Sequence, residues 1–158
     1  MASAFRPTLA GGGADYPEVK SFSIEAASAI IYGDLVFFDT ADNLVKPCAA
    51  DPTVILGIAL SDGAVATKNI FPNSKIPIAV LSSKDKVVMG SSTTPLQTHI
   101  LRTYGVVKTG NNWLVDISEV TTMSLTVVDY SPHSGDVGQE WFVVRFLAAA
   151  LQGDSVVS

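Results

Sequence analysis

Polar and apolar residues alternate strictly in the segment SFSIE, residues 21–25. This period of two predicts a half-buried β-strand, because successive side chains of a strand point to opposite faces. The following stretch, residues 29–38, is apolar at eight of ten positions and is interrupted only by Gly33 and Asp34. Glycine tolerates a positive φ and aspartate caps turns, so the pair predicts a bend between two apolar segments. The second of these, residues 35–38, is apolar on both faces and is expected to be a central strand between two packed layers.

Turn residues divide the chain after this point into further short apolar segments. The cluster DTADN at residues 39–43 leads into residues 44–46, which are predicted to return as the partner strand of a hairpin that ends at Pro47. Residues 53–60 are again apolar on both faces, and Gly57 within them suits a β-bulge or a close approach of another backbone.

The middle of the chain predicts one long loop and a second hairpin. Residues 61–75 have no clean period and contain glycine, proline and asparagine, which indicates a long loop or an irregular insertion. Strand character resumes at residues 76–81, where Pro77 favours an edge position, and again at residues 86–89 after a polar turn. We expect these two strands to pair with each other.

A short helix and a further hairpin are predicted next. Thr94 is placed to cap a helix over residues 95–101, with a proline at its first position. Residues 106–108 and 113–117 flank a T-G-N-N turn, and the second segment is apolar at every other position. Both features predict a β-hairpin with a well-specified register.

The last two strands are expected at residues 125–130 and 141–146, which gives eight to ten short strands in all. This pattern predicts a mainly β fold, a compact β-barrel or a tulip-like β-sandwich with short helical segments and an extended N-terminal arm. The length of 158 residues fits one domain. We divide the chain into an extended arm (1–20), a single β-rich domain (21–151) and a loose C-terminal tail (152–158).

Composition restricts the kinds of partner that the chain can have. Hydrophobic residues make up 47% and charged residues only 16%, and the mean hydropathy is positive. So apolar a chain is expected to bury part of its surface against a partner or another copy of itself. The net charge is −5, and the ten Lys and Arg residues form no basic stripe, which argues against direct binding of nucleic acid.

Location signals and cysteine usage are consistent with folding in a reducing cytoplasm. Cys48 is the only cysteine, so no internal disulfide can form. No continuous apolar stretch follows Arg6, as a secretory signal would require. The apolar run at residues 141–151 is broken by Arg145 and is about half the length of a membrane helix, so no membrane association is expected.

Candidate reactive groups are few and scattered. The glycines at residues 11–13 lack the lysine and the following helix of a phosphate-binding loop, and are interpreted as part of a flexible arm. His99 is interpreted as a helix-end residue without ligand spacing. Asp34 and Asp39 are an odd number of residues apart, so along a strand they would point to opposite faces, and both are interpreted as turn residues. Cys48 is expected to be inert packing.

One loop gathers residues that could form a cation site or a hydrolase constellation. Asp129, His133 and Asp136 lie close together in sequence, with Ser131 and Ser134 between them. The simpler interpretation is a polar turn, because cation sites usually gather more carboxylates and no nucleophile-elbow motif is present. The sequence therefore assigns no catalytic, cofactor-binding or metal-ligating residue, and we expect no enzymatic activity and no cofactor.

The two tryptophans have a structural and a functional interpretation. Trp113 and Trp141 each begin a predicted strand with apolar neighbours at a period of two, which favours packing in the core. An exposed tryptophan would instead suggest sugar stacking or a partner-binding hot spot.

Three segments together resemble a known family. The segment AASAIIYGDLV at residues 26–36, the segment NLVKP at residues 43–47 and the segment ILGIAL at residues 55–60 are similar to the decoration, or cement, proteins of tailed-bacteriophage capsids. The later segments YGVVKTGNNWLVDIS and EWFVVRFLAAAL are similar to the C-terminal half of some relatives, so the resemblance covers about residues 20–150.

The resemblance implies a structural role without catalysis. It implies a compact β-barrel or tulip-like sandwich on the outer surface of the expanded phage head, often as a homotrimer, that bridges neighbouring copies of the major capsid protein. On this hypothesis residues 1–20 and the loop at residues 61–75 contact the capsid or a neighbouring copy. A tail or baseplate component and a carbohydrate-binding module remain the alternative interpretations.

Overall fold

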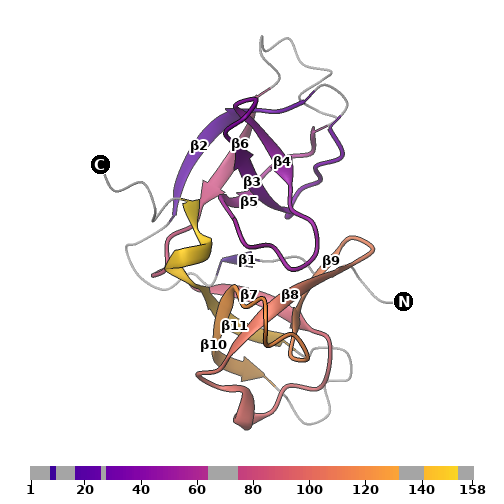
Figure 1. Ribbon diagram of the computed structural model, residues 1–158, viewed down its shortest axis with the longest axis vertical. Helices are drawn as coiled ribbons and strands as arrows, with labels where there is room; N and C mark the ends of the chain where they lie inside the picture. The colour runs from indigo at the N-terminus through magenta and orange to yellow at the C-terminus, as the bar shows by residue number, and fades with distance from the viewer. Residues whose placement is uncertain (1–7, 10–16, 26–27, 64–74, 132–140, 153–158) are drawn as a thin grey trace.

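The computed structural model describes residues 8–9, 17–25, 28–63, 75–131 and 141–152, and these residues form a mainly β structure with two sheets. Figure 1 shows the two sheets stacked along the long axis of the molecule. The strands are β1 (Thr8–Leu9), β2 (Glu18–Ser23), β3 (Leu35–Asp39), β4 (Leu44–Pro47), β5 (Gly57–Ala59), β6 (Lys75–Val80), β7 (Val87–Ser91), β8 (Thr103–Thr109), β9 (Asn112–Asp116), β10 (Leu125–Ser131) and β11 (Trp141–Phe146).

The C-terminal half of the chain forms a closed barrel. Strands β7, β11, β10, β8 and β9 follow one another in hydrogen-bonded order, and a parallel pairing of β9 with β7 closes the ring. The two-residue strand β1 pairs with the remaining part of the free edge of β7. The predicted barrel is therefore confirmed, and closure leaves the five strands with few unpaired backbone groups.

The N-terminal half forms a five-stranded antiparallel sheet in the order β2-β6-β5-β3-β4. A single parallel bridge between Ile24 and Val45 brings the two outer strands of this sheet together. The residues inside the curved sheet form a core of their own: Ile24, Ile30, Val36, Val45, Leu56, Ala59, Ile76 and Ile78.

The larger core joins the sheet to the barrel. Leu35, Ile55, Ile58 and Leu81 from the N-terminal half belong to the same buried cluster as Trp113 and the other inward residues of the barrel. Strand β3 shows how one strand serves both cores, because Leu35 contributes to the shared core and its neighbour Val36 to the sheet core. This confirms the prediction that residues 35–38 lie between two packed layers.

Two predicted hairpins are confirmed. Strands β3 and β4, and strands β8 and β9, pair antiparallel as expected. The last two predicted strands, β10 and β11, also pair antiparallel with each other. Gly33 and Gly110 occupy positive φ angles of 90° and 62° at the predicted bends, a region that glycine enters without steric cost. Gly57 lies where another backbone approaches closely, as its position between apolar residues suggested.

Two predictions about strands are wrong. Strand β6 is interior rather than at an edge, because it pairs with β2 on one side and with β5 on the other. The carbonyl of Pro77 accepts a hydrogen bond from the N–H of Leu60, just beyond the end of β5. The N–H that proline lacks would therefore point past the end of β5, where no ladder hydrogen bond is lost. Strands β6 and β7 do not form a hairpin, because they belong to different sheets. Residues 29–32, which were predicted only as an apolar segment, form no strand, although Ile30 is fully buried in the sheet core.

Within the described residues, one short 3₁₀ helix lies in the range of the predicted helix, and another lies near the C-terminal end of the barrel. The first, η1 (Gln97–His99), lies inside the predicted range of residues 95–101, but its N-cap is Leu96 rather than Thr94. The second, η2 (Ala148–Ala150), was not predicted. No helix within the described residues is long and apolar enough to cross a bilayer.

Both chain ends contribute contacts that the predicted arm and tail boundaries did not include. Strand β1 lies within the predicted arm, and in Figure 1 it is on the side of the barrel that faces the sheet. Strand β2 begins at Glu18, before the predicted domain start. Gln152, assigned to the tail, holds the backbone of Phe38 through two hydrogen bonds, with Phe38 N–H donating to Oε1 at 2.7 Å and Nε2 donating to the Phe38 carbonyl at 2.8 Å.

Candidate functional site

The predicted cation or hydrolase constellation is not assembled by the described residues. Asp129 is exposed on β10, and its Oδ1 accepts a hydrogen bond from the neighbouring N–H of Tyr130 at 2.8 Å. His133, Ser134 and Asp136 lie outside the described residues, as do the glycines at residues 11–13. No group of three or more His, Cys, Asp or Glu side chains in the described part of the chain is placed to hold a metal ion.

His99 is buried at the end of η1 and has a structural role. Its Nδ1 accepts a hydrogen bond from the N–H of Leu96 at 3.0 Å. Its ring lies edge-on to Tyr104 and Phe142, with centroid separations of 6.0 and 5.6 Å. The imidazole therefore fixes the turn against the barrel core, in agreement with its interpretation as a helix-end residue.

The two tryptophans have different environments. Trp113 is fully buried in the shared core, as predicted. The prediction of core packing is wrong for Trp141, which is only half-buried, because Phe142, Val144 and Phe146 take the inward positions of β11 and leave Trp141 on the outer face of the barrel. A sugar cannot stack on Trp113 in this structure.

A buried carboxylate links the sheet to the barrel. Asp34 is only 1% exposed, and its Oδ2 accepts the N–H of Ile31 at 2.9 Å across the Gly33 bend. Its Oδ1 accepts the indole N–H of Trp113 at 3.1 Å, and the Lys108 Nζ lies 3.5 Å from the same oxygen. The Lys108 amine also lies 5.1 Å from the centre of the Trp113 ring, a cation–π contact. Asp34 thus has a second role beyond the turn to which the sequence assigned it.

Cys48 lies near this link and is held in its thiol form. Its Sγ is 3.6 Å from the Val54 carbonyl, to which it donates. Burial raises the pKa of the thiol to about 12, the negative charge of Asp34 adds to the increase, and Lys108 opposes it. A buried thiol with so high a pKa is a poor nucleophile at neutral pH, which agrees with its interpretation as inert packing.

We expect the Cys48 thiol to titrate in a way that lowers stability in alkali. Between pH 9 and about 12 the unfolded chain loses the thiol proton while the folded chain retains it, so the contribution to stability is present below pH 9 and is lost as the pH rises. Urea unfolding of the wild type and of Cys48→Ala at pH 8 and 10.5 measures the difference. An equal loss of stability in both proteins would contradict the assignment.

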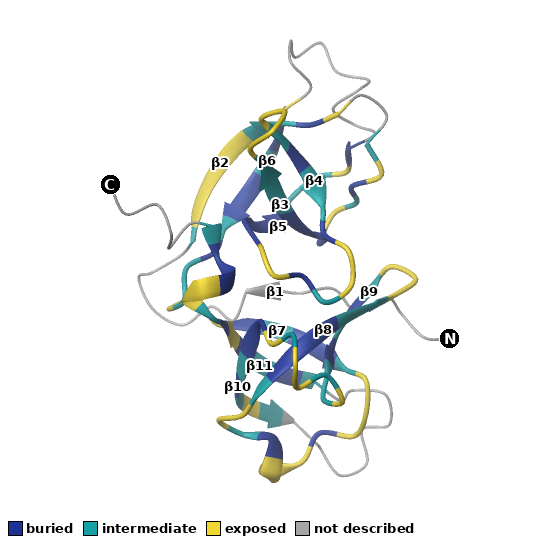
Figure 2. Ribbon diagram, in the orientation of Figure 1, coloured by how far each residue is buried: buried dark blue, intermediate teal, exposed yellow. Residues whose placement is uncertain are grey.

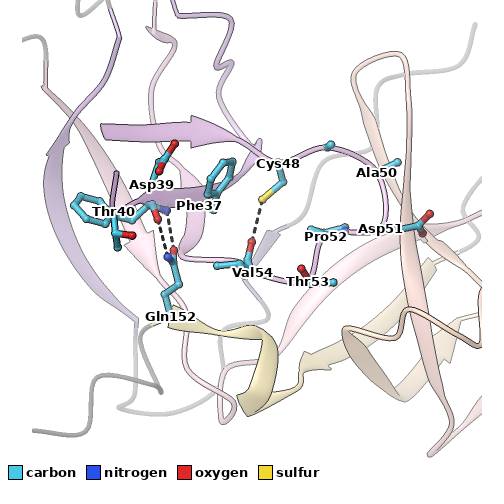
Figure 3. A pocket seen from close by; sticks show the side chains of 12 residues that line it. Phe37, Asp39, Thr40, Cys48, Ala50, Asp51, Pro52, Thr53, Val54 and Gln152 are labelled. Atoms are coloured by element: carbon cyan, nitrogen blue, oxygen red, sulfur yellow. Dashed lines mark hydrogen bonds between the residues drawn. The ribbon is translucent and has the colours of Figure 1, made fainter. Parts of the chain in front are cut away.

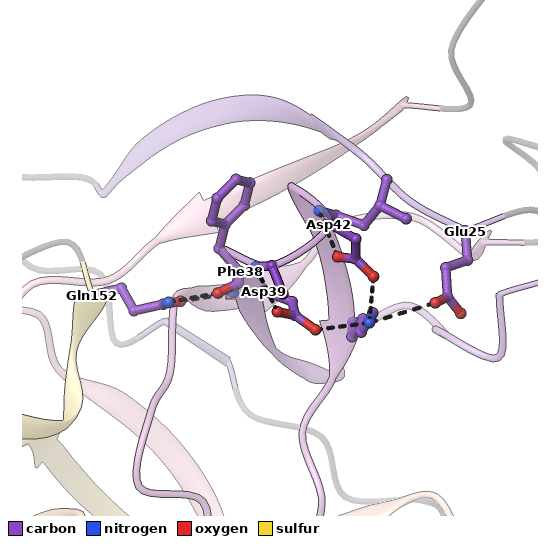
Figure 4. Close-up of polar contacts among 8 residues, drawn as sticks. Glu25, Phe38, Asp39, Asp42 and Gln152 are labelled. Carbon is purple, nitrogen blue, oxygen red and sulfur yellow. Dashed lines mark hydrogen bonds and ion pairs between the residues drawn. The ribbon is translucent and has the colours of Figure 1, made fainter.

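Lys46 forms a partly exposed ionic network with three carboxylates. Its Nζ lies 2.8 Å from Asp39, 2.6 Å from Asp42 and 3.6 Å from Glu25, which ties the β3–β4 hairpin to the end of β2 (Figure 4). The hydrogen bond from Lys46 lowers the pKa of Asp39, and the hydrogen bonds to Asp39 and Asp42 raise the pKa of Lys46. The lysine holds the three carboxylates of two neighbouring elements together, so the network has a structural role.

An open cavity of about 580 Å³ lies between the β3–β4 hairpin and the loop at residues 48–54. Figure 3 shows the Gln152 amide at one side of it, and the Cys48 thiol directed at the Val54 carbonyl. Two carboxylates line the cavity, but the thiol donates to neither of them. The described lining residues are Phe37, Phe38, Asp39, Thr40, Cys48, Ala49, Ala50, Asp51, Pro52, Thr53, Val54 and Gln152.

Asp51 is a strained residue at the far side of this cavity. Its backbone has a φ of 51°, and its N–H donates to the Val106 carbonyl at 2.8 Å. Its Oδ1 is buried without a hydrogen-bond partner among the described residues. Burial raises the pKa of Asp51, and Glu119 and Asp116 raise it further. The hydrogen bond from the Asp51 N–H to the Val106 carbonyl holds the loop at residues 48–54 against β8.

Large apolar side chains exposed to solvent are the remaining feature with functional potential. Among the described residues, four of the seven lie on two barrel connections, residues 92–102 and residues 117–124. A contact of 2.7 Å between Thr103 Oγ1 and Met123 Sδ joins the second connection to the start of β8, directly after the first connection. Figure 2 shows exposed residues around η1 at the free end of the barrel. The seven are Val19, Tyr32, Val54, Leu96, Leu101, Val120 and Met123.

Comparison with known proteins adds no assignment. No protein-family model, curated protein or solved structure matches the chain. The class that the fold defines is therefore a small all-β protein with a closed five-stranded barrel and a second sheet.

Proposed function

We propose that this chain is a structural virion protein, a capsid decoration or cement protein that binds the outer surface of the expanded phage head. Its partner is the major capsid protein, whose lattice it stabilises, and it acts as a homotrimer without catalysis. The observation that carries the proposal is the group of large apolar side chains on the two barrel connections. The resemblance of residues 20–150 to decoration proteins supports it.

The architecture gives the exposed apolar residues a rigid support. Two cores share strand β3, and a buried hydrogen bond joins the sheet to the barrel, so the connections that carry the exposed apolar residues rest on a rigid support. Binding only to the assembled lattice would stabilise it by mass action, and a trimer would gain further from the high effective concentration of its second and third contacts.

The proposal is tested with expanded phage heads that lack this protein. We expect saturable co-sedimentation at a fixed ratio to the major capsid protein, and release of packaged DNA at a higher temperature once the sites are filled. Heads that already carry their full complement of the protein are the control, and should bind no more of it. Absence of binding to the depleted heads would overturn the proposal and direct attention to phage tails and baseplates.

A further inference from the structure

Leu101 has an unusual combination of exposure and backbone conformation. Its side chain is 76% exposed, and its φ of 62° lies in the left-handed region, which is costly for leucine and easily adopted by glycine or asparagine. Backbone hydrogen bonds fix this conformation, since its N–H donates to the Val127 carbonyl at 2.7 Å and the N–H of Arg102 donates to the His99 carbonyl at 3.3 Å. The fold gains almost no burial from this leucine. Strain at such a residue points to a function outside the fold.

Other exposed apolar residues lie near Leu101. Leu96, which is 53% exposed, precedes the single turn of η1 that Leu101 follows. Met123, which is 41% exposed, contacts Thr103 two residues after Leu101. The three side chains therefore belong to one part of the barrel surface, where β8 begins.

Two arginines lie near these residues. Arg102 follows Leu101 and is exposed, and Arg145 lies on the neighbouring outer face, since β10 pairs Thr126 with Arg145 on one side and with Thr103 on the other. They are the two arginines of the described chain, and neither forms an ion pair there. We call Leu96, Leu101, Arg102, Met123 and Arg145 the Leu101 surface. It carries two arginines on a protein whose net charge is −5. The nearest exposed carboxylate on β10 is Asp129, which lies opposite Val143 of β11.

We propose that the Leu101 surface docks on the major capsid protein, with Leu101 inserted into an apolar pocket whose rim is acidic. This inference rests on the proposed function and identifies its contact site. Charge complementarity selects the occupant, because arginine pairs closely with carboxylates. A twofold contact between two copies of this surface would place the arginines of both copies together, which like-charge repulsion opposes. A heterologous contact within a trimer is distinguished from capsid docking by the oligomeric state of the variants.

Leu101→Asn is the first test, because asparagine keeps the backbone conformation and removes the apolar anchor. We expect an unfolding temperature equal to or above that of the wild type, and affinity for depleted expanded heads at least about tenfold lower. Val19→Thr is the matched control: Val19 is 56% exposed on β2, in the other sheet, and its replacement should leave binding unchanged. Wild-type affinity of Leu101→Asn would overturn the docking surface.

Salt dependence tests the acidic rim separately. We expect Arg102→Gln and Arg145→Gln to weaken binding to heads and to reduce its sensitivity to salt, without a change in the unfolding temperature. Lys20→Gln, an exposed position on β2, is the control. Unchanged salt dependence in both arginine variants would overturn the acidic rim.

The same experiment separates failure of this inference from failure of the proposed function. If the wild type binds heads and the variants bind equally well, the decoration role stands and the Leu101 surface is wrong. If the wild type does not bind, both fail. A variant that loses its oligomeric state in light scattering, while each remaining protomer binds heads normally, would make the surface a contact between copies and overturn the proposal.

Discussion

Gly57→Ala is expected to destabilise the protein by about 3 kcal/mol or more, or to prevent folding. A Cβ atom at this position would lie 1.9 Å from the Ala79 carbonyl oxygen and 2.8 Å from its carbon. Both are backbone atoms of the adjacent strand β6, so no side-chain rotation can relieve the overlap. The strands β5 and β6 would have to separate in the middle of the sheet, between residues of both cores. Urea unfolding, followed by tryptophan fluorescence, measures the change.

Gly110→Ala supplies the control for this prediction. Gly110 lies at the β8–β9 turn with a φ of 62°, and no atom would lie within 4 Å of an added Cβ. Its replacement should cost only the strain of a left-handed alanine, about 1 kcal/mol. Equal losses of stability in the two variants would show that the close approach at Gly57 does not exist.

Local signals in the sequence predicted the parts of the fold that depend on neighbours in the chain. The Gly33 bend, the turn between β8 and β9 and the alternation around Trp113 were all readable, because turn geometry and side-chain period are set within a few residues. The mainly β class followed from the number and spacing of such segments.

The failures involve partners far away in the chain. Strand β6 pairs within the N-terminal sheet and β7 within the barrel, although the two strands follow each other in the chain. This choice of partners depends on packing against distant residues, and no local sequence pattern predicts it. The burial of Ile30 in a segment without a strand has the same origin, since an apolar run indicates burial but not hydrogen bonding. Trp141 faces outward because the pleat of β11 assigns Phe142 to the core, and a register error of one residue reverses the face.

The candidate site was less accessible from sequence than the fold. The Leu101 surface was found only from a backbone dihedral angle and an exposed fraction, because the sequence placed Leu101 simply at the end of a short predicted helix. Asp34 carried a partial signal, because a Gly-Asp pair between apolar segments predicts a turn. Its contact with Trp113 joins residues 79 positions apart, and no local pattern predicts such a pair.

The Asp34 contact is expected to dominate the coupling between the sheet and the barrel. Asp34→Ala should cost about 3 kcal/mol, because it leaves the buried Trp113 N–H without an acceptor and removes the carboxylate facing Lys108. Asp39→Ala, which removes a partly exposed partner of Lys46, is the control and should change stability little. Urea unfolding at neutral pH compares the two variants.

A double-mutant cycle isolates the contact from the loss of packing. Trp113→Phe removes the indole N–H but keeps an aromatic ring in the shared core, and should be destabilising by itself. If the hydrogen bond couples the two halves, the combined Asp34→Ala and Trp113→Phe variant should lose less stability than the sum of the single changes, by about 1 kcal/mol or more. Losses that add to within about 0.5 kcal/mol would show that the two side chains act independently. The shared apolar core alone would then hold the sheet on the barrel, and the rigid support for the Leu101 surface would not depend on Asp34.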